Sequence, residues 1–166
     1  MSSAWVGIDP GARGAIAVVD SSGAWAVFDL PRQGAPGARG VFRLIEAIWH
    51  TAGNAVVCIE LQRAYGGQGV VSSCALGQAY GWIRGVVDAW AGYAGSAVHL
   101  VSPDKWQPVI LGRRSKGGPT AKERALVVAA SAAPSIALQT PRGRVLDGRA
   151  DAICIALYAR KMWGEG

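Results

Sequence analysis

Three short apolar runs, each bounded by turn residues, open the chain. The first ends at Asp9 and is followed by a glycine-rich turn at 10–14; the second covers 15–19 and the third covers 24–29. Apolar runs of this length between Gly-, Asp- and Ser-rich turns are typical of β-strands, and short connections of this kind join antiparallel neighbours. We therefore predict that the chain begins with three antiparallel strands.

The hydrophobic period then changes to that of a helix. After a loop at 30–40, rich in proline and glycine, apolar positions at 41, 44, 45, 48 and 49 predict an amphipathic helix that ends near Gly53. A buried-type strand follows at 54–60 and, like the first strand, it ends in an acid, Glu60. If the first and fourth strands are neighbours, Asp9 and Glu60 lie side by side.

Helices and strands alternate in the rest of the chain. The further predicted elements are a helix from Ser72 or Ser73 to about Trp90, a strand at 97–102, a helical turn at 103–107, a helix from a Thr120–Glu123 capping box to about 132, and a helix at 147–161. Three strands followed by this alternation indicate one α/β domain, 1–166, with a sheet covered by helices.

The predicted helix at 72–90 carries an unusual second face. Gly77, Gly81 and Gly85 recur every four residues, and each glycine costs a helix roughly 1 kcal/mol relative to alanine. A smooth face for close packing, either on the sheet or on a second subunit, would compensate for this cost.

Composition narrows the class of protein. The chain has 166 residues and is 51% hydrophobic, which is typical of one globular domain, and its apolar runs are too short for a membrane span. It starts without the basic segment of a secretory signal, and its three cysteines lie far apart, so we expect reduced thiols and a cytoplasmic location. A net charge of +6 favours a polyanionic partner such as nucleic acid.

Four of the eleven acids occupy unusual places. Asp9 and Glu60 each end an apolar strand, and Asp147 and Asp151 begin the last predicted helix at positions i and i+4, on one face. Carboxylates brought together repel one another unless cations neutralise them, and oxygen ligands suit Mg²⁺ or Mn²⁺. The pattern therefore predicts a metal-dependent phosphodiester-cleaving site built from these four acids.

Simpler interpretations exist for several of these residues. Asp9 could have the purely structural role of capping a turn, and Asp147 could likewise act only as a helix N-cap. Trp106 is more readily explained as a core residue than as a DNA contact. Asp151 is harder to explain without a function, because it lies in an otherwise apolar helix face.

Four segments, in this order, resemble the RuvC family of Holliday junction resolvases, within the RNase H-like superfamily. They are Gly7-Ile8-Asp9-Pro10-Gly11, Cys58-Ile59-Glu60, Leu76-Gly77-Gln78-Ala79-Tyr80-Gly81 and Asp147-Gly148-Arg149-Ala150-Asp151-Ala152. Two further stretches resemble the phage-type branch: Val101-Ser102-Pro103 with Trp106, and Ala121-Lys122-Glu123-Arg124-Ala125.

The resemblance implies an RNase H-like mixed sheet of five strands, the three antiparallel ones first and then parallel ones, flanked by helices. It implies a homodimeric, Mg²⁺-dependent endonuclease, for which Mn²⁺ can substitute, that nicks branched DNA in a bacterial or phage-infected cell. Asp9, Glu60 and Asp151 would be metal ligands, Asp147 would be the fourth acid, and the glycine-striped helix would lie at or near the dimer interface.

The sequence departs from the family at two places. Cellular members usually space the last two acids by three residues, whereas here the spacing is four. They also tend to carry an aromatic residue three positions after the glutamate, where this chain has Arg63, with Tyr65 two further on. The residues predicted to contact DNA are Arg13, Arg63, Tyr65, Lys105, Arg113, Arg114, Lys116, Lys122 and Arg124.

Three other functions are compatible with parts of this sequence pattern. A related nuclease that acts on flaps, forks or RNA–DNA hybrids would use the same acids. A sugar kinase or actin-like protein also opens with a strand, an acid and a glycine turn, but we expect that fold to need more than 166 residues. A non-catalytic DNA-binding module would not need all four acids.

Overall fold

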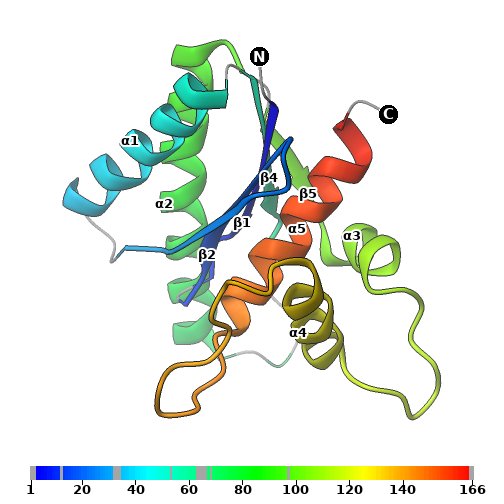
Figure 1. The fold of residues 1–166 in the computed structure, drawn as a ribbon. Coiled ribbons are helices and arrows are strands. Elements are labelled where there is room, and N and C mark those ends of the chain that lie inside the picture. Colours follow the sequence, from blue (N-terminus) through cyan, green and yellow to red (C-terminus); the bar gives the residue numbers. More distant parts are fainter. Residues whose placement is uncertain are drawn as a thin grey trace.

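A five-stranded mixed sheet forms the centre of the protein, as a computed structural model of the chain shows (Figure 1). The structure describes residues 3–11, 13–31, 35–52, 54–62, 67, 69–96 and 98–164. The strands are β1 (Ser3–Asp9), β2 (Ala15–Asp20), β3 (Trp25–Asp29), β4 (Asn54–Glu60) and β5 (Val98–Val101). Their order across the sheet is β3-β2-β1-β4-β5.

The direction of the strands follows the length of their connections. Short turns join β1 to β2 and β2 to β3, and both pairs are antiparallel. Long helical connections precede β4 and β5, and these strands run parallel to β1 and β4 respectively. The predicted fold class is therefore confirmed, including the neighbouring position of the first and fourth strands.

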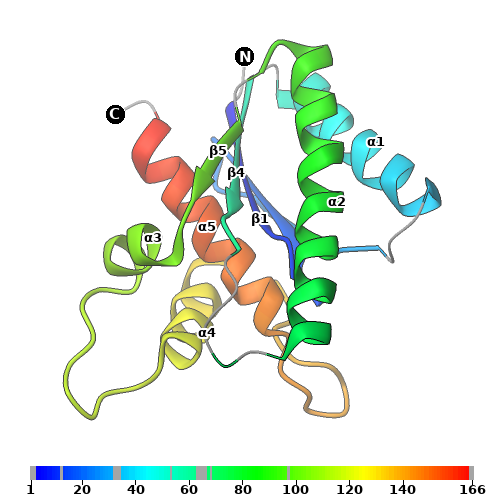
Figure 2. The same ribbon diagram turned by 180° about the vertical axis from the view of Figure 1, so that it is seen from behind.

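Helices cover both faces of the sheet (Figures 1 and 2). They are α1 (Ala35–Ala52), α2 (Val70–Ala94), α3 (Pro103–Ile110), α4 (Ala121–Ala132) and α5 (Asp147–Trp163). The first two lie on one face and the other three on the opposite face. No helix in the described ranges is long and apolar enough to cross a membrane.

The alternation of side chains along β1 separates the two cores. Val6 and Ile8 point toward α1 and α2, where they pack with residues such as Ile83 and Trp90. Trp5 points the other way, toward α5, together with Cys58 of β4. Helix α5 is buried along most of its length because it lies across the middle of the sheet.

Gly7 allows α5 to approach β1 closely. A Cβ atom at this position would overlap the backbone of Ala152 and Ala156, so no side chain fits there without moving the helix. Ala152 and Ala156 have short side chains, which also allow α5 to lie close to β1. The position of Asp151 relative to β1 depends on this contact, since Asp151 precedes Ala152 in the helix.

Several predicted boundaries were wrong. The loop predicted at 30–40 ends earlier, because α1 already begins at Ala35; a proline in the first helical turn forgoes no hydrogen bond. Helix α2 begins at Val70, with Gly69 rather than Ser72 or Ser73 as its N-cap, and it continues to Ala94. The helical turn predicted at 103–107 extends to Ile110.

The capping box of α4 is confirmed. Thr120 accepts a hydrogen bond from the Glu123 backbone N–H, and the Glu123 side chain accepts one from the Thr120 N–H. This fixes the start of α4 beside the start of α5, and it places Lys122 next to the first residue of α5.

Candidate active site

The strand ends and the start of α5 bring the predicted acids together. Asp9 ends β1 and Glu60 ends β4, and Ile8 pairs with Ile59 immediately before them, so the two acids come next to each other at one edge of the sheet. Asp151 lies one turn into α5, which packs on this part of the sheet. Residues 9, 60 and 151 are far apart in the sequence, and only the sheet order and the placement of α5 join them.

Each of these three acids has a raised pKa. The pKa of Asp9 is raised from 3.8 to about 6, mainly by burial; the Gly11 N–H lowers it and the nearby Asp147 carboxylate raises it. Burial and then the charge of Asp9 raise the pKa of Glu60 to about 7. These shifts mean that the fold brings negative charges close together and removes much of the water that would stabilise them.

Asp151 shows the strongest effect. Burial, followed by the charges of Asp9, Glu60 and Asp147, raises its pKa to about 8. No described residue donates a hydrogen bond to its carboxylate. A half-buried carboxylate without a donor, facing three others, is an environment that a divalent cation would stabilise.

Asp147 differs from the other three acids. Its Oδ2 accepts a hydrogen bond from Lys122 Nζ at 2.7 Å, and this bond keeps the pKa of Asp147 below its usual value. The N-cap of α5 is Leu146, so the interpretation of Asp147 as an N-cap is wrong. Its side chain instead links the acidic cluster to α4.

Two neutral donors orient Glu60. Trp106 Nε1 donates to Oε1 at 2.9 Å, and Gln62 Nε2 donates to Oε2 at 2.7 Å. Trp106 is 1% exposed, which confirms the prediction that it is a core residue. Its contact with Glu60 could not be predicted, because the two residues are 46 positions apart in the sequence. Gln62 was also missed, although its position two residues after Glu60 was visible in the sequence.

The donor set fits a hard divalent cation. Asp9, Glu60 and Asp151 offer only carboxylate oxygens, the ligands that Mg²⁺ and Mn²⁺ prefer. As the side chains stand, no three His, Cys, Asp or Glu residues of the described part of the chain enclose a metal position. The acids are thus close enough for their charges to interact, and metal binding would require their side chains to adjust.

The predicted DNA-contacting residues occupy different environments. Arg13 is exposed in the β1–β2 turn, Lys105 is exposed on α3, and Arg113, Arg114 and Lys116 are exposed in the loop between α3 and α4. Arg124 instead donates to the carbonyls of Leu111 and Gly112, so it holds the base of that loop. Arg63 and Tyr65 lie outside the described residues.

The raised pKa values predict how stability depends on pH. In the absence of divalent cations, the unfolded chain releases protons from these acids near pH 4, whereas the folded protein holds them until about pH 6, 7 and 8. Since the folded state binds more protons, the free energy of unfolding should fall as the pH rises from 5.5 to 8, by at least about 2 kcal/mol.

Urea unfolding in EDTA at pH 5.5 and pH 8 measures this change. Added Mg²⁺ should recover stability at pH 8, because a ligand of the folded state shifts the unfolding equilibrium. Equal stability at the two pH values would contradict the electrostatic description of the site.

The similarity of this protein to known proteins lies in its fold. No family model matches the sequence, and no curated protein matches it significantly. The structure is similar to Thermus thermophilus RuvC in complex with a Holliday junction substrate, with a TM-score of 0.63 and 22% identity over 97% of this chain and 96% of that one. A further structure of Thermus thermophilus RuvC aligns over the same shares with a TM-score of 0.58 and 22% identity. The chain therefore has the RNase H-like fold of RuvC over nearly its whole length.

Proposed function

We propose that the protein is a Mg²⁺-dependent endonuclease that cleaves four-way junctions and other branched DNA, as a member of the RuvC family. The observation that carries this proposal is the convergence of Asp9, Glu60 and Asp151, each buried or half-buried and each with a raised pKa, in a fold similar to RuvC. The similar structure of RuvC holds a Holliday junction substrate, which supports the same class of substrate here.

The acids would bind the metal ions, and neighbouring residues would hold the acids in position. Asp9, Glu60 and Asp151 would hold two Mg²⁺ ions, with Asp147 as the fourth acid, and Mn²⁺ could replace Mg²⁺. When bound, the ions would activate water for in-line attack and stabilise the departing 3′ oxygen. The Trp106 and Gln62 donors fix the orientation of Glu60, and the Gly11 N–H at 3.0 Å does the same for Asp9.

Exposed cations would bind the DNA backbone. Lys105, Arg113, Arg114 and Lys116 lie on α3 and in the adjoining loop, on the same face of the sheet as α5. Contacts of this kind give affinity without sequence preference, and that affinity falls with salt. We include Arg63 and Tyr65 in this proposal on the basis of the sequence alone.

We propose further that the protein acts as a homodimer through α2. Gly77, Gly81 and Gly85 lie on an exposed face of this helix with no atom near enough to contact an added Cβ. Beside them, α1 and α2 form a shallow, almost wholly apolar groove lined by residues such as Phe42 and Trp82. A second copy of α2 would cover this face and place two active sites in one particle, as symmetric cleavage requires. We include the phage-type branch in the proposal only on the basis of the stretches of sequence that resemble it.

The test is cleavage of a synthetic four-way junction compared with linear duplex, a Y-fork and an RNA–DNA hybrid, all with Mg²⁺. We expect paired nicks in the junction, little cleavage of the linear duplex, and no cleavage in EDTA. Preferential cleavage of the hybrid would overturn the proposal in favour of a ribonuclease, and preferential cleavage of the fork would favour a flap-cutting enzyme.

A further inference from the structure

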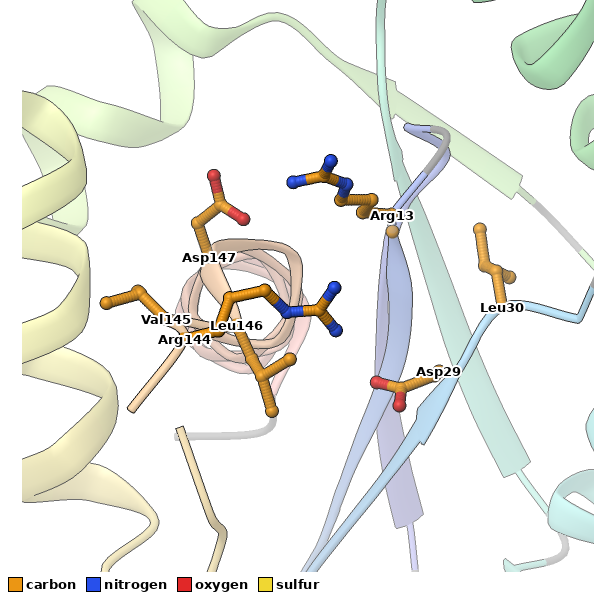
Figure 3. Close-up of a pocket in the computed structure, with 8 residues that line it drawn as sticks. Arg13, Asp29, Leu30, Arg144, Val145, Leu146 and Asp147 are labelled. Atoms are coloured by element: carbon orange, nitrogen blue, oxygen red, sulfur yellow. The ribbon is translucent and has the colours of Figure 1, made fainter. Parts of the chain in front are cut away.

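A small cavity adjoins the acidic cluster on the side away from Glu60 (Figure 3). It lies between the β1–β2 turn, the end of β3 and the segment that leads into α5, and its volume is about 160 Å³. Arg13, Asp29, Arg144 and Asp147 contribute its charged lining. Figure 3 shows Arg13 reaching from the strand side toward the start of α5, and Arg144 reaching back from the α5 side toward the strands.

Both acids that line the cavity are already neutralised. Arg149 donates to both carboxylate oxygens of Asp29, at 2.7 and 2.8 Å, and this pair holds the pKa of Asp29 below its usual value. Asp147 is paired with Lys122. The negative charges of the lining are therefore matched before Arg13 and Arg144 are counted.

The two remaining arginines have no hydrogen-bond partner among the described residues, although the charge of Arg144 contributes, after that of Arg149, to lowering the pKa of Asp29. Neither the Arg13 nor the Arg144 guanidinium forms a hydrogen bond or ion pair with any residue in the described ranges. Two uncommitted guanidinium groups that face one cavity repel each other, and an anion between them would remove that repulsion. The cavity is thus suited to a negatively charged ligand.

The walls of the cavity are set before any ligand binds. A Cβ atom at Gly148 would overlap the carbonyl of Arg13, so this glycine lets the β1–β2 turn rest directly on the start of α5. Leu30 N–H donates to the Gly14 carbonyl at 3.0 Å, and Arg149 joins β3 to α5 through Asp29 and to the preceding segment through the Ala137 carbonyl. A ligand would therefore find Arg13 and Arg144 on a fixed frame.

We propose that this cavity binds one backbone phosphate of the DNA strand, next to the phosphodiester that is cut. The size of the cavity favours a single phosphate group, because it is well below the roughly 300–1,000 Å³ of sites that enclose larger ligands. One guanidinium group can donate two parallel hydrogen bonds to two oxygens of a phosphate, which a lysine ammonium group cannot do. Since Asp147 belongs both to this cavity and to the acidic cluster, a phosphate here neighbours the cleaved one. This inference rests on the proposed function.

Arg142 provides a matched control for Arg144. It lies in the same exposed segment, two residues away, and it does not line the cavity. Arg142→Ala and Arg144→Ala therefore remove the same charge from nearly the same place. Binding of a four-way junction is measured with Ca²⁺ in place of Mg²⁺, over a range of salt concentrations, after thermal melting has shown that both variants are folded.

We expect Arg144→Ala to weaken binding about 5- to 10-fold and to reduce the slope of log affinity against log salt by about 1, as the loss of one phosphate contact does. Arg142→Ala should weaken binding less than 2-fold. A scan with single methylphosphonates, each of which neutralises one phosphate, should find one position near the cut where wild-type binding falls by a similar factor. Arg144→Ala should show no additional loss at that position.

The outcomes separate this inference from the proposed function. If Arg142→Ala and Arg144→Ala bind alike while the wild type still cuts junctions, the phosphate site is wrong and the nuclease stands. Additive losses from Arg144→Ala and every methylphosphonate would overturn it in the same way. A wild-type protein that binds no DNA would overturn both.

Discussion

Asp151→Asn is expected to lower the rate of Mg²⁺-dependent junction cleavage by about 1,000-fold or more and, at the same time, to make the protein more stable at pH 8. The loss follows because a metal ligand contributes several kcal/mol to stabilisation of the transition state, and about 4 kcal/mol corresponds to 1,000-fold in rate. The gain follows because Asp151, with a pKa raised to about 8 by burial and by three nearby acids, carries an unfavourable charge at that pH.

The two effects can be measured on the same preparation. Single-turnover cleavage gives the rate, junction binding in Ca²⁺ shows that the substrate is still held, and urea unfolding in EDTA gives the stability. The gain in unfolding free energy should be about 2 kcal/mol at pH 8 and smaller at pH 5.5. A variant that loses both cleavage and stability would indicate a structural role for Asp151 instead.

Asp147→Asn is the comparison within the same helix. Because Lys122 already neutralises Asp147 and lowers its pKa, this change should not stabilise the protein at pH 8. If Asp147→Asn cleaves as fast as the wild type, Asp147 is not a metal ligand and only links α5 to α4.

Gly7→Ala is expected to destabilise the protein by at least about 3 kcal/mol, although it adds a single methyl group. That group would meet the backbone of Ala152 and Ala156, which cannot rotate away as a side chain could. Helix α5 would have to move off β1, and Asp151 would move with it. Thermal unfolding should show a drop of about 10 °C, on the scale of 2–4 °C per kcal/mol for a chain of this size.

Gly92→Ala is the matched control for this prediction. Gly92 is exposed on α2, and an added Cβ there would meet no atom within 4 Å. Replacing a glycine inside a helix should be neutral or stabilising by about 0.5–1 kcal/mol. Similar melting temperatures for wild type and Gly7→Ala would refute the close contact between β1 and α5.

Elements with a strong local signal were predicted well. The apolar runs that became β1, β2 and β4, the Thr120–Glu123 capping box and the buried stripe of α2 depend on neighbouring residues, so the sequence contains their causes. The starts of α1 and α2 were misplaced for different reasons. Proline and glycine in the first turn of α1 have the same composition as a loop, whereas α2 begins with Val70 directly after its N-cap Gly69, ahead of the two serines that indicated a later start. Where a helix begins there depends on what its later turns pack against.

For the candidate site, the sequence by itself determined which acids lie at strand ends and on one face of the last helix, because those facts depend only on local periodicity. The tertiary structure decided that Asp9, Glu60 and Asp151 share one buried environment, that Lys122 sets Asp147 apart from them, and that Trp106 holds Glu60. It also decided that Arg13 and Arg144 face one cavity. Each of these relations joins residues that are distant in the chain, and only the order of the strands and the close packing of α5 on β1 bring them together.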